Sequence, residues 1–165
     1  MKGGGGLAHK KRKCRTMRNK NALHSQVDAL VCYLYTEANY LKRKCCSVNK
    51  TTHWKARGSQ QTLRSIARHL AAVRAQYHKR VALVLALQNY LHCLETSTAD
   101  AEEEARQSRP NRNATTIERW KAEGELQVLP GICASLSDLV HRYAPTNIFH
   151  TLSPDGESLV PLYET

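Results

Sequence analysis

Lysine and arginine residues crowd the stretch from residue 42 to residue 68 of this chain, and a histidine and a tryptophan stand among them. The set consists of Lys42, Arg43, Lys44, Lys50, His53, Trp54, Lys55, Arg57, Arg64 and Arg68. Cationic side chains neutralise phosphate groups, and the counterions that are released favour binding. An exposed tryptophan can in addition stack on an unpaired base. These residue types therefore predict a surface that contacts the backbone of a nucleic acid.

The tryptophan of this stretch has a second interpretation. Trp54 lies between two segments with a helical apolar pattern. Tryptophan side chains are usually well buried, and the indole N–H needs only one partner. Trp54 would then close the end of a helical hairpin. The sequence leaves base stacking and hairpin closure open.

A second cationic run lies near the start of the sequence. Lys10, Lys11, Arg12, Lys13 and Arg15 fall within residues 1–20, which contain no acidic residue and little apolar surface to offset the entropy lost on ordering. We therefore predict a disordered, flexible basic arm. Four consecutive cations are typical of a nuclear-localisation signal and would also contact phosphates. The pattern favours the nucleus, and the nucleolus within it, and the alternatives are a plain solvated tail and a mitochondrial presequence. The presequence is disfavoured because the arm is poor in serine and has no amphipathic stripe.

Charge is distributed unevenly along the chain. Residues 1–80 contain 19 Lys and Arg against two acidic residues, residues 81–165 contain 6 against 12, and the formal net charge is +11 with a pI near 9.6. An excess of this size favours an anionic partner. Nucleic acid is preferred to a membrane, because no stretch approaches the roughly 18 consecutive apolar residues that span a bilayer. We expect RNA, structured or single-stranded, and no membrane partner.

Motifs for catalysis and for cofactor or metal binding are missing from the sequence. There is no glycine-rich phosphate loop between a strand and a helix, no G-x-S-x-G and no H-E-x-x-H. The six cysteines form no C-x-x-C pair, which leaves zinc without closely spaced ligand pairs and indicates reduced intracellular thiols. We therefore expect a protein that is not an enzyme and holds no cofactor or metal.

Three long segments carry an amphipathic helical pattern, with apolar residues at steps of three and four. They are residues 21–46, 59–94 and 115–143. The pattern predicts the all-α class and an antiparallel three-helix bundle over residues 21–145, with an acidic and polar linker at about 96–114. Pro130 and Gly131 either kink the third helix or divide it.

Most of the cationic stretch falls in the connection between the first two predicted helices. Residues 41–59 are basic and polar, and Gly58 near their end is a helix breaker. In the long second helix, Arg57, Arg64 and Arg68 fall on the side opposite the apolar stripe. They should therefore continue the cationic surface of the connection.

Two charged residues lie close to apolar helix faces. Glu37 falls on the apolar side of the first helix, and Arg80 falls near the apolar side of the second. Opposite charges in such positions predict a buried ion pair. Alternatively, each side chain reaches solvent along its flexible stem.

Residues 146–165 form the predicted extended C-terminal tail. They include Ile148, Phe149 and Leu152, and further apolar residues follow a Ser-Pro-Asp-Gly turn signal. This apolar content predicts that the tail docks on the bundle or on a partner protein.

A set of residues between 23 and 75 resembles a known family. It consists of Glu37, Leu41, Arg43, Asn49, Lys50, His53, Trp54, Gln61, Leu63, Arg64 and Arg68. These residues resemble the N-terminal helical domain of the nucleolus and neural progenitor protein (Nepro) family and the related small, MRP-specific protein subunit of ribonuclease MRP. The resemblance implies a helical, nucleolar RNA-binding accessory of ribonuclease MRP or P, or of ribosomal RNA processing.

The function expected from the sequence is that of a non-catalytic RNA-binding subunit of a nuclear or nucleolar ribonucleoprotein, with other protein subunits of the same complex as partners. Its cations would neutralise the RNA backbone. The alternative is a helical scaffold subunit of a cytoskeletal or chromosome-segregation assembly, which would bind acidic protein with the same basic face. The sequence leaves both open.

Overall fold

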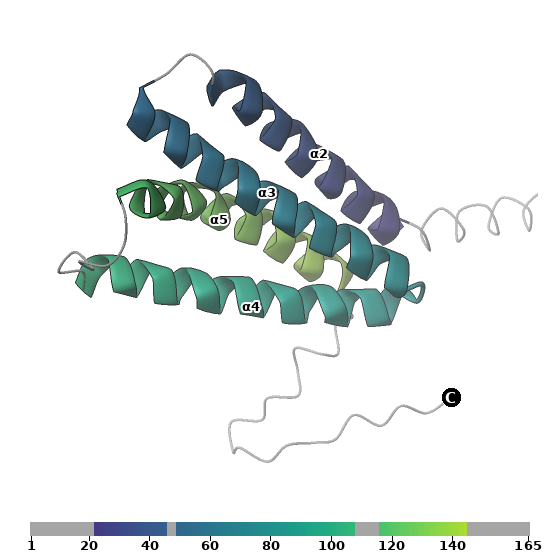
Figure 1. Ribbon diagram of the computed structural model, residues 1–165. Helices are drawn as coiled ribbons and strands as arrows, with labels where there is room; N and C mark the ends of the chain where they lie inside the picture. Colours follow the sequence, from purple (N-terminus) through teal and green to yellow (C-terminus); the bar gives the residue numbers. More distant parts are fainter. Residues whose placement is uncertain (1–21, 46–48, 108–115, 145–165) are drawn as a thin grey trace, which may run out of the picture.

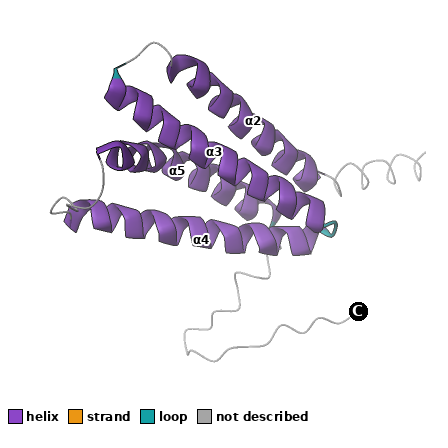
Figure 2. Ribbon diagram, in the orientation of Figure 1, coloured by secondary structure: helices purple, strands orange, loops and turns teal. Residues whose placement is uncertain are grey.

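The computed structural model describes residues 22–45, 49–107 and 116–144. Within these residues the chain forms four α-helices and no strand (Figures 1 and 2). They are α2 (Ala22–Lys44), α3 (Lys50–Gln76), α4 (Arg80–Gln107) and α5 (Thr116–Tyr143). The all-α class is confirmed, but the predicted number of three helices is wrong. The predicted basic arm at 1–20 and the predicted tail at 146–165 lie outside the described residues.

The second predicted helix, residues 59–94, is two helices in the structure. α3 ends at Gln76, where Tyr77 adopts an extended backbone with φ −106° and ψ 102°, and α4 begins at Arg80. His78 and Lys79 therefore lie in the turn and not on a helix face. The turn contains no glycine or proline, and the apolar steps continue across it. Periodicity alone consequently predicts one continuous helix here.

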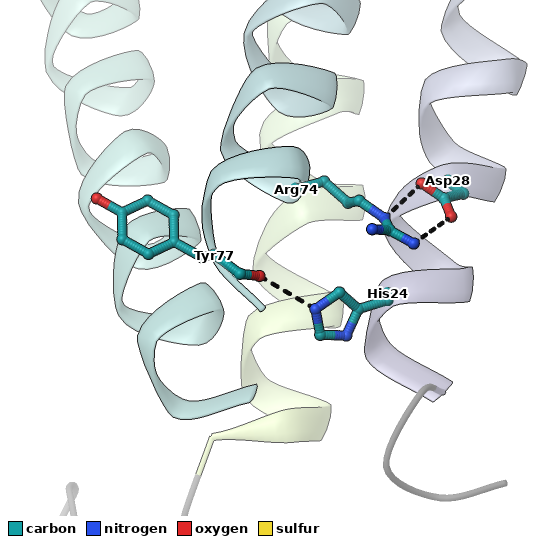
Figure 3. A network of polar contacts seen from close by, with 4 residues as sticks. All are labelled: His24, Asp28, Arg74 and Tyr77. Atoms are coloured by element: carbon teal, nitrogen blue, oxygen red, sulfur yellow. Dashed lines mark hydrogen bonds and ion pairs between the residues drawn. The ribbon is translucent and has the colours of Figure 1, made fainter. Parts of the chain in front are cut away.

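Contacts from α2 hold the end of α3 (Figure 3). Nε2 of the buried His24 ring lies 3.1 Å from the carbonyl oxygen of Tyr77. One turn further along α2, Asp28 accepts two hydrogen bonds from Arg74, of 2.9 Å from Nε and 3.1 Å from Nη2. A two-point contact between a guanidinium and a carboxylate fixes their relative orientation. The start of α2 therefore lies at the same end of the bundle as the α3–α4 turn.

The predicted buried ion pair between Glu37 and Arg80 is wrong. Arg80 is exposed, and its Nη2 donates a 3.4 Å hydrogen bond to the carbonyl oxygen of Tyr143, with the guanidinium 5.4 Å from the centre of the Tyr143 ring. Because His24 meets Tyr77 at this end of the bundle, Glu37 lies about 20 Å away along α2, at 1.5 Å per residue. Arg80 reaches solvent, as the alternative interpretation predicts.

α3 is the central helix. It lies between α2 and α4 in the view of Figure 1, with α5 behind it, and both α2 and α5 pack along it, whereas α4 packs mainly on α5. One apolar core joins all four helices. Its largest fully buried side chains are Leu23, Val27, Leu34, Leu70, Leu83, Val84, Leu87 and Leu136. Burying one such side chain contributes about 1.5–3 kcal/mol, more than an exposed ion pair does.

Two glycines allow α3 and α5 to cross in close contact. Gly58 lies against the backbone of Lys121, and Gly124 lies against the backbone of Lys55, so that a Cβ atom at either glycine would overlap a carbonyl oxygen. At the same crossing, the hydroxyl of Ser59 donates a 2.6 Å hydrogen bond to the carbonyl oxygen of Gly124. The residue type of Gly58 predicts a helix break, but the residue lies inside α3 and the helix continues through it. Gly58 provides the space for a helix contact.

The connection between α2 and α3 is shorter than the predicted 41–59. Asn49 is the N-cap of α3, and its Oδ1 accepts a 2.9 Å hydrogen bond from the backbone N–H of Thr52. A side-chain cap of this kind stabilises a helix by about 1 kcal/mol. The cations from Lys50 onward consequently lie on a helix and not in a loop.

The second half of the chain forms two long helices. α4 extends to Gln107, so the first part of the predicted linker at 96–114 is helical. α5 runs through Pro130 as a single helix, so it is not divided there. Pro130 and Gly131 are both exposed.

Candidate nucleic-acid interface

Four cations of α3 share one side of the helix. Lys50, Arg57 and Arg64 follow one another at intervals of seven residues, and Arg68 lies four residues further on. Such intervals return to the same side of a helix, about 10 Å and 6 Å apart along its axis. The buried Leu63 lies on the opposite side. Lys50, Arg57 and Arg68 are exposed and Arg64 is half-buried. We call these four residues the cationic stripe.

The whole of α3 is free of acidic residues. Its 27 residues contain six Lys and Arg and two His, but no Asp or Glu. Three of the cations contact polar side chains of neighbouring helices. One is Arg74, which pairs with Asp28. Nζ of Lys55 lies 2.6 Å from Glu123 of α5, and Nη2 of Arg64 donates a 3.1 Å hydrogen bond to Oδ1 of Asn39 of α2. Lys55 therefore lies away from the stripe, although the sequence places it in the same cationic run.

The remaining stripe cations have no such neighbour. Lys50, Arg57 and Arg68 form no hydrogen bond or ion pair within residues 22–45, 49–107 and 116–144. A cation without a carboxylate partner gains the full benefit of neutralising a phosphate, because no existing pair has to be broken. These three residues are the strongest candidates for contacts with an anionic ligand.

Further cations lie where α2 ends. Lys42, Arg43 and Lys44 form the last turn of α2 and are exposed, and Nζ of Lys44 lies 5.9 Å from the centre of the Tyr40 ring. Cations in this position oppose the negative end of the helix dipole. α3 begins nearby with Lys50 and has no acidic residue in its first turn to oppose its positive end. The α2–α3 side of this end of the bundle is therefore positive, whereas the end of α4 and the start of α5 bring Glu102, Glu103 and Glu118 to the same end.

His53 has a structural contact. Its Nδ1 lies 3.1 Å from the carbonyl oxygen of Cys45, at the end of α2, and the thiol of Cys45 lies 4.0 Å from the carbonyl oxygen of His53. The ring thereby links the two ends of the α2–α3 connection. The sequence predicts that His53 contacts RNA, but one of its two ring nitrogens is engaged in this contact within the protein.

Trp54 is half-buried between the stripe and α5. Nζ of Lys121 lies 5.2 Å from the centre of the indole ring, and the ring of His53 meets Trp54 edge-on at 5.1 Å. The cation–π contact with Lys121 engages the ring with α5. Base stacking by Trp54 stays a prediction. Lys121, which brings another cation to this region, is not marked by any sequence pattern.

The α4–α5 side of the bundle is different in character. Tyr90 of α4 stacks on the ring of His69 of α3, with centroids 3.9 Å apart. Burial raises the pKa of Tyr90 to about 12, and nearby Cys133 and Cys93 add to the rise. Burial also raises the pKa of the Cys133 thiol. Both groups are therefore uncharged at neutral pH, and a protonated thiol is the less nucleophilic form.

A metal cluster and a membrane-spanning helix are both absent from the described residues. No three His, Cys, Asp or Glu side chains gather there as a metal site, and no helix there is long and apolar enough to cross a membrane. The predicted contacts of Lys10, Lys11, Arg12, Lys13 and Arg15 lie outside the described residues. Comparison with models of protein families, with curated proteins and with solved structures finds no match.

Proposed function

We propose that this protein binds RNA through the cationic stripe of α3 and the basic end of α2, as a non-catalytic subunit of a nuclear or nucleolar ribonucleoprotein. The observation that carries the proposal is a 27-residue helix without any acidic residue, three of whose exposed cations have no partner in the described part of the chain. The family resemblance suggests that this ribonucleoprotein is ribonuclease MRP or P, or a particle that acts in pre-rRNA processing.

The arrangement of the cations suits a phosphate backbone. Stripe residues lie about 10 Å and 6 Å apart on a straight helix, so the stripe reaches several successive phosphates of an extended strand. Contacts of this kind position a nucleic acid but do not select its sequence. We therefore expect RNA affinity with little dependence on base sequence, and specificity from other subunits or from RNA shape.

Titration of a labelled single-stranded RNA at several KCl concentrations tests the proposal. Each phosphate neutralised on a single strand contributes about 0.7 to the slope of log affinity against log salt, so three contacts give a slope of about −2. Fluorescence anisotropy measures the affinity. An absence of binding at low salt, or affinity that does not change with salt, would contradict the proposal. Tighter binding of polyglutamate than of RNA would favour the alternative, a scaffold subunit that binds acidic protein.

The proposed nuclear location depends on the basic arm. Replacing Lys10, Lys11, Arg12 and Lys13 with alanine should move the protein to the cytoplasm, because import receptors bind consecutive cations. A fusion to several fluorescent proteins, too large to diffuse through nuclear pores, measures the distribution. The same replacement of Lys42, Arg43 and Lys44 is the control and should leave the fusion nuclear. Nuclear accumulation of both variants would show that the arm is not the import signal.

A further inference from the structure

A groove runs between α2 and α5 on the side of α3 opposite the cationic stripe. Its central part is a hollow of about 400 Å³ between Tyr33 of α2 and Val128 of α5, with Leu63 of α3 at its floor. A second hollow of about 290 Å³ adjoins it, because Gln127 lines both. The two helices that form the walls have few direct contacts with each other. An elongated segment can therefore lie between them.

The two parts of this α2–α5 groove differ in chemistry. The central hollow is lined mainly by apolar residues, and Glu37 is the one acidic residue that lines it. Tyr33 at its rim is 58% exposed. The second hollow, towards the end of α2, is lined by two lysines, Lys44 and Lys55, the latter also paired with Glu123. An occupant that is apolar first and acidic afterwards would match this order.

We propose that residues 145–157, the first part of the C-terminal segment of this same chain, occupy the α2–α5 groove. This segment contains no Lys or Arg, and it carries Ile148, Phe149 and Leu152 ahead of Asp155 and Glu157. Along the segment, apolar residues come first and acidic residues follow. Along the groove, the apolar hollow likewise comes first and the hollow lined by lysines follows. Prolines at 145 and 154 oppose a long helix and favour an extended segment.

The exit point of the chain agrees with this placement. α5 ends at Tyr143, beside Arg80, at the end of the bundle farthest from the lysines. Ser135 and Gln127 of the groove lie about 12 Å and 24 Å back along α5, at 1.5 Å per residue. A chain that reverses after Ala144 brings Phe149 about 17 Å back and Leu152 about 26 Å back, at 3.3 Å per residue. Phe149 then reaches the apolar hollow, Leu152 reaches its far edge at Gln127, and Asp155, about 36 Å back, reaches the lysine end.

Fluorine NMR can test the proposal without altering the sequence of the tail. Phe149 is the only phenylalanine of the chain, so biosynthetic incorporation of para-fluorophenylalanine gives the full-length protein one fluorine signal, and that signal comes from the proposed occupant. The reference is a synthetic peptide of residues 145–165 with the same label. We expect the signal of the protein to be displaced from that of the peptide, because the ring is buried against apolar side chains. Coinciding signals would overturn the proposal.

A matched pair of variants locates the contact. Gly131 lines the groove and has no atom within 4 Å of the position of a Cβ, whereas Ala134 is exposed on α5 and does not line the groove. Gly131→Trp should fill the groove and return the fluorine signal to the peptide position, and Ala134→Trp should leave it displaced. If Gly131→Trp fails to fold by circular dichroism, Ser135→Trp, which also alters the lining, takes its place.

The remaining outcomes would each contradict the proposal. A displaced signal that Gly131→Trp leaves unchanged places the tail elsewhere on the bundle. Displacement that fades on dilution shows that the groove binds the tail of a second copy. The inference goes beyond the proposed RNA function. Lys44 belongs both to the basic end of α2 and to the lining of the groove, but the fluorine experiment contains no RNA, so its result does not depend on that function.

Discussion

Gly124→Ala should destabilise the bundle by about 2–3 kcal/mol, the upper part of the range for overpacking a tightly packed site. The added methyl group would overlap the carbonyl oxygen of Lys55. Relief requires that α3 and α5 move apart, because the neighbour is backbone and cannot turn away as a side chain can. That movement would also weaken the hydrogen bond from Ser59 to Gly124. Urea denaturation followed by circular dichroism measures the change.

Gly131→Ala provides the control with the opposite sign. Gly131 lies in the same helix but has open space where the Cβ would be. Alanine at an unobstructed helical position is more stable than glycine by about 0.8–1 kcal/mol. The two variants therefore make the same chemical change in one helix, and only their surroundings differ. Equal stability of both variants would mean that α3 and α5 do not meet at Gly124.

Replacing Arg57 and Arg68 with glutamine should weaken RNA binding roughly 25-fold at 0.1 M salt. The loss of two phosphate contacts reduces the magnitude of the salt slope by about 1.4. Over the tenfold range from 1 M to 0.1 M salt, this difference in slope corresponds to a difference of about 25-fold in affinity. Glutamine keeps the length, the polarity and the helix propensity, so the melting temperature should stay near that of the wild type. Anisotropy titrations at several salt concentrations measure both quantities.

A matched control uses an exposed cation at the other end of the bundle. Lys79 lies in the α3–α4 turn, away from the stripe. Lys79→Gln lowers the net charge by one and the double arginine variant lowers it by two, so a general effect of charge would give Lys79→Gln half of the change in log affinity. We expect Lys79→Gln to leave the slope unchanged. Wild-type affinity and slope in the double arginine variant would exclude the stripe as the RNA surface.

The apolar periodicity predicted the bounds of the first and the last described helices closely. The segments 21–46 and 115–143 correspond to α2 (Ala22–Lys44) and α5 (Thr116–Tyr143), because apolar steps of three and four mark the side of a helix that is buried. The same pattern failed between Gln76 and Arg80. There the helix ends at a tertiary contact with His24, and a contact between distant residues leaves no trace in local spacing.

The cationic surface was predicted in part. The structure places Arg57, Arg64 and Arg68 on one side of α3, the arrangement expected from their spacing. Lys50 joins them because Asn49 caps the helix. That signal was present in the sequence, since asparagine is a favoured N-cap residue. The engagement of Lys55 with Glu123 could not be predicted, because their proximity depends on how α3 crosses α5.

The structural role of glycine was not predictable from residue type alone. A glycine in a helical pattern lowers helix propensity wherever it occurs, so residue type alone predicts that Gly58 breaks the helix. Its actual role depends on Lys121 of another helix, 63 residues later in the chain. Gly131, by contrast, meets nothing. Only the packing distinguishes the two.

The short turn between α3 and α4 separates two helices that the sequence pattern alone would join. Tyr77, His78 and Lys79 have no bar to a helical conformation, and the apolar stripe continues through them. If the turn straightened, residues 50–107 would form one helix about 87 Å long. α4 and α5 would then pack on α2 and α3 of a second molecule, giving a domain-swapped dimer with the buried core of the monomer. Such a dimer would present two cationic stripes, and one RNA held by both would gain avidity without any new contact.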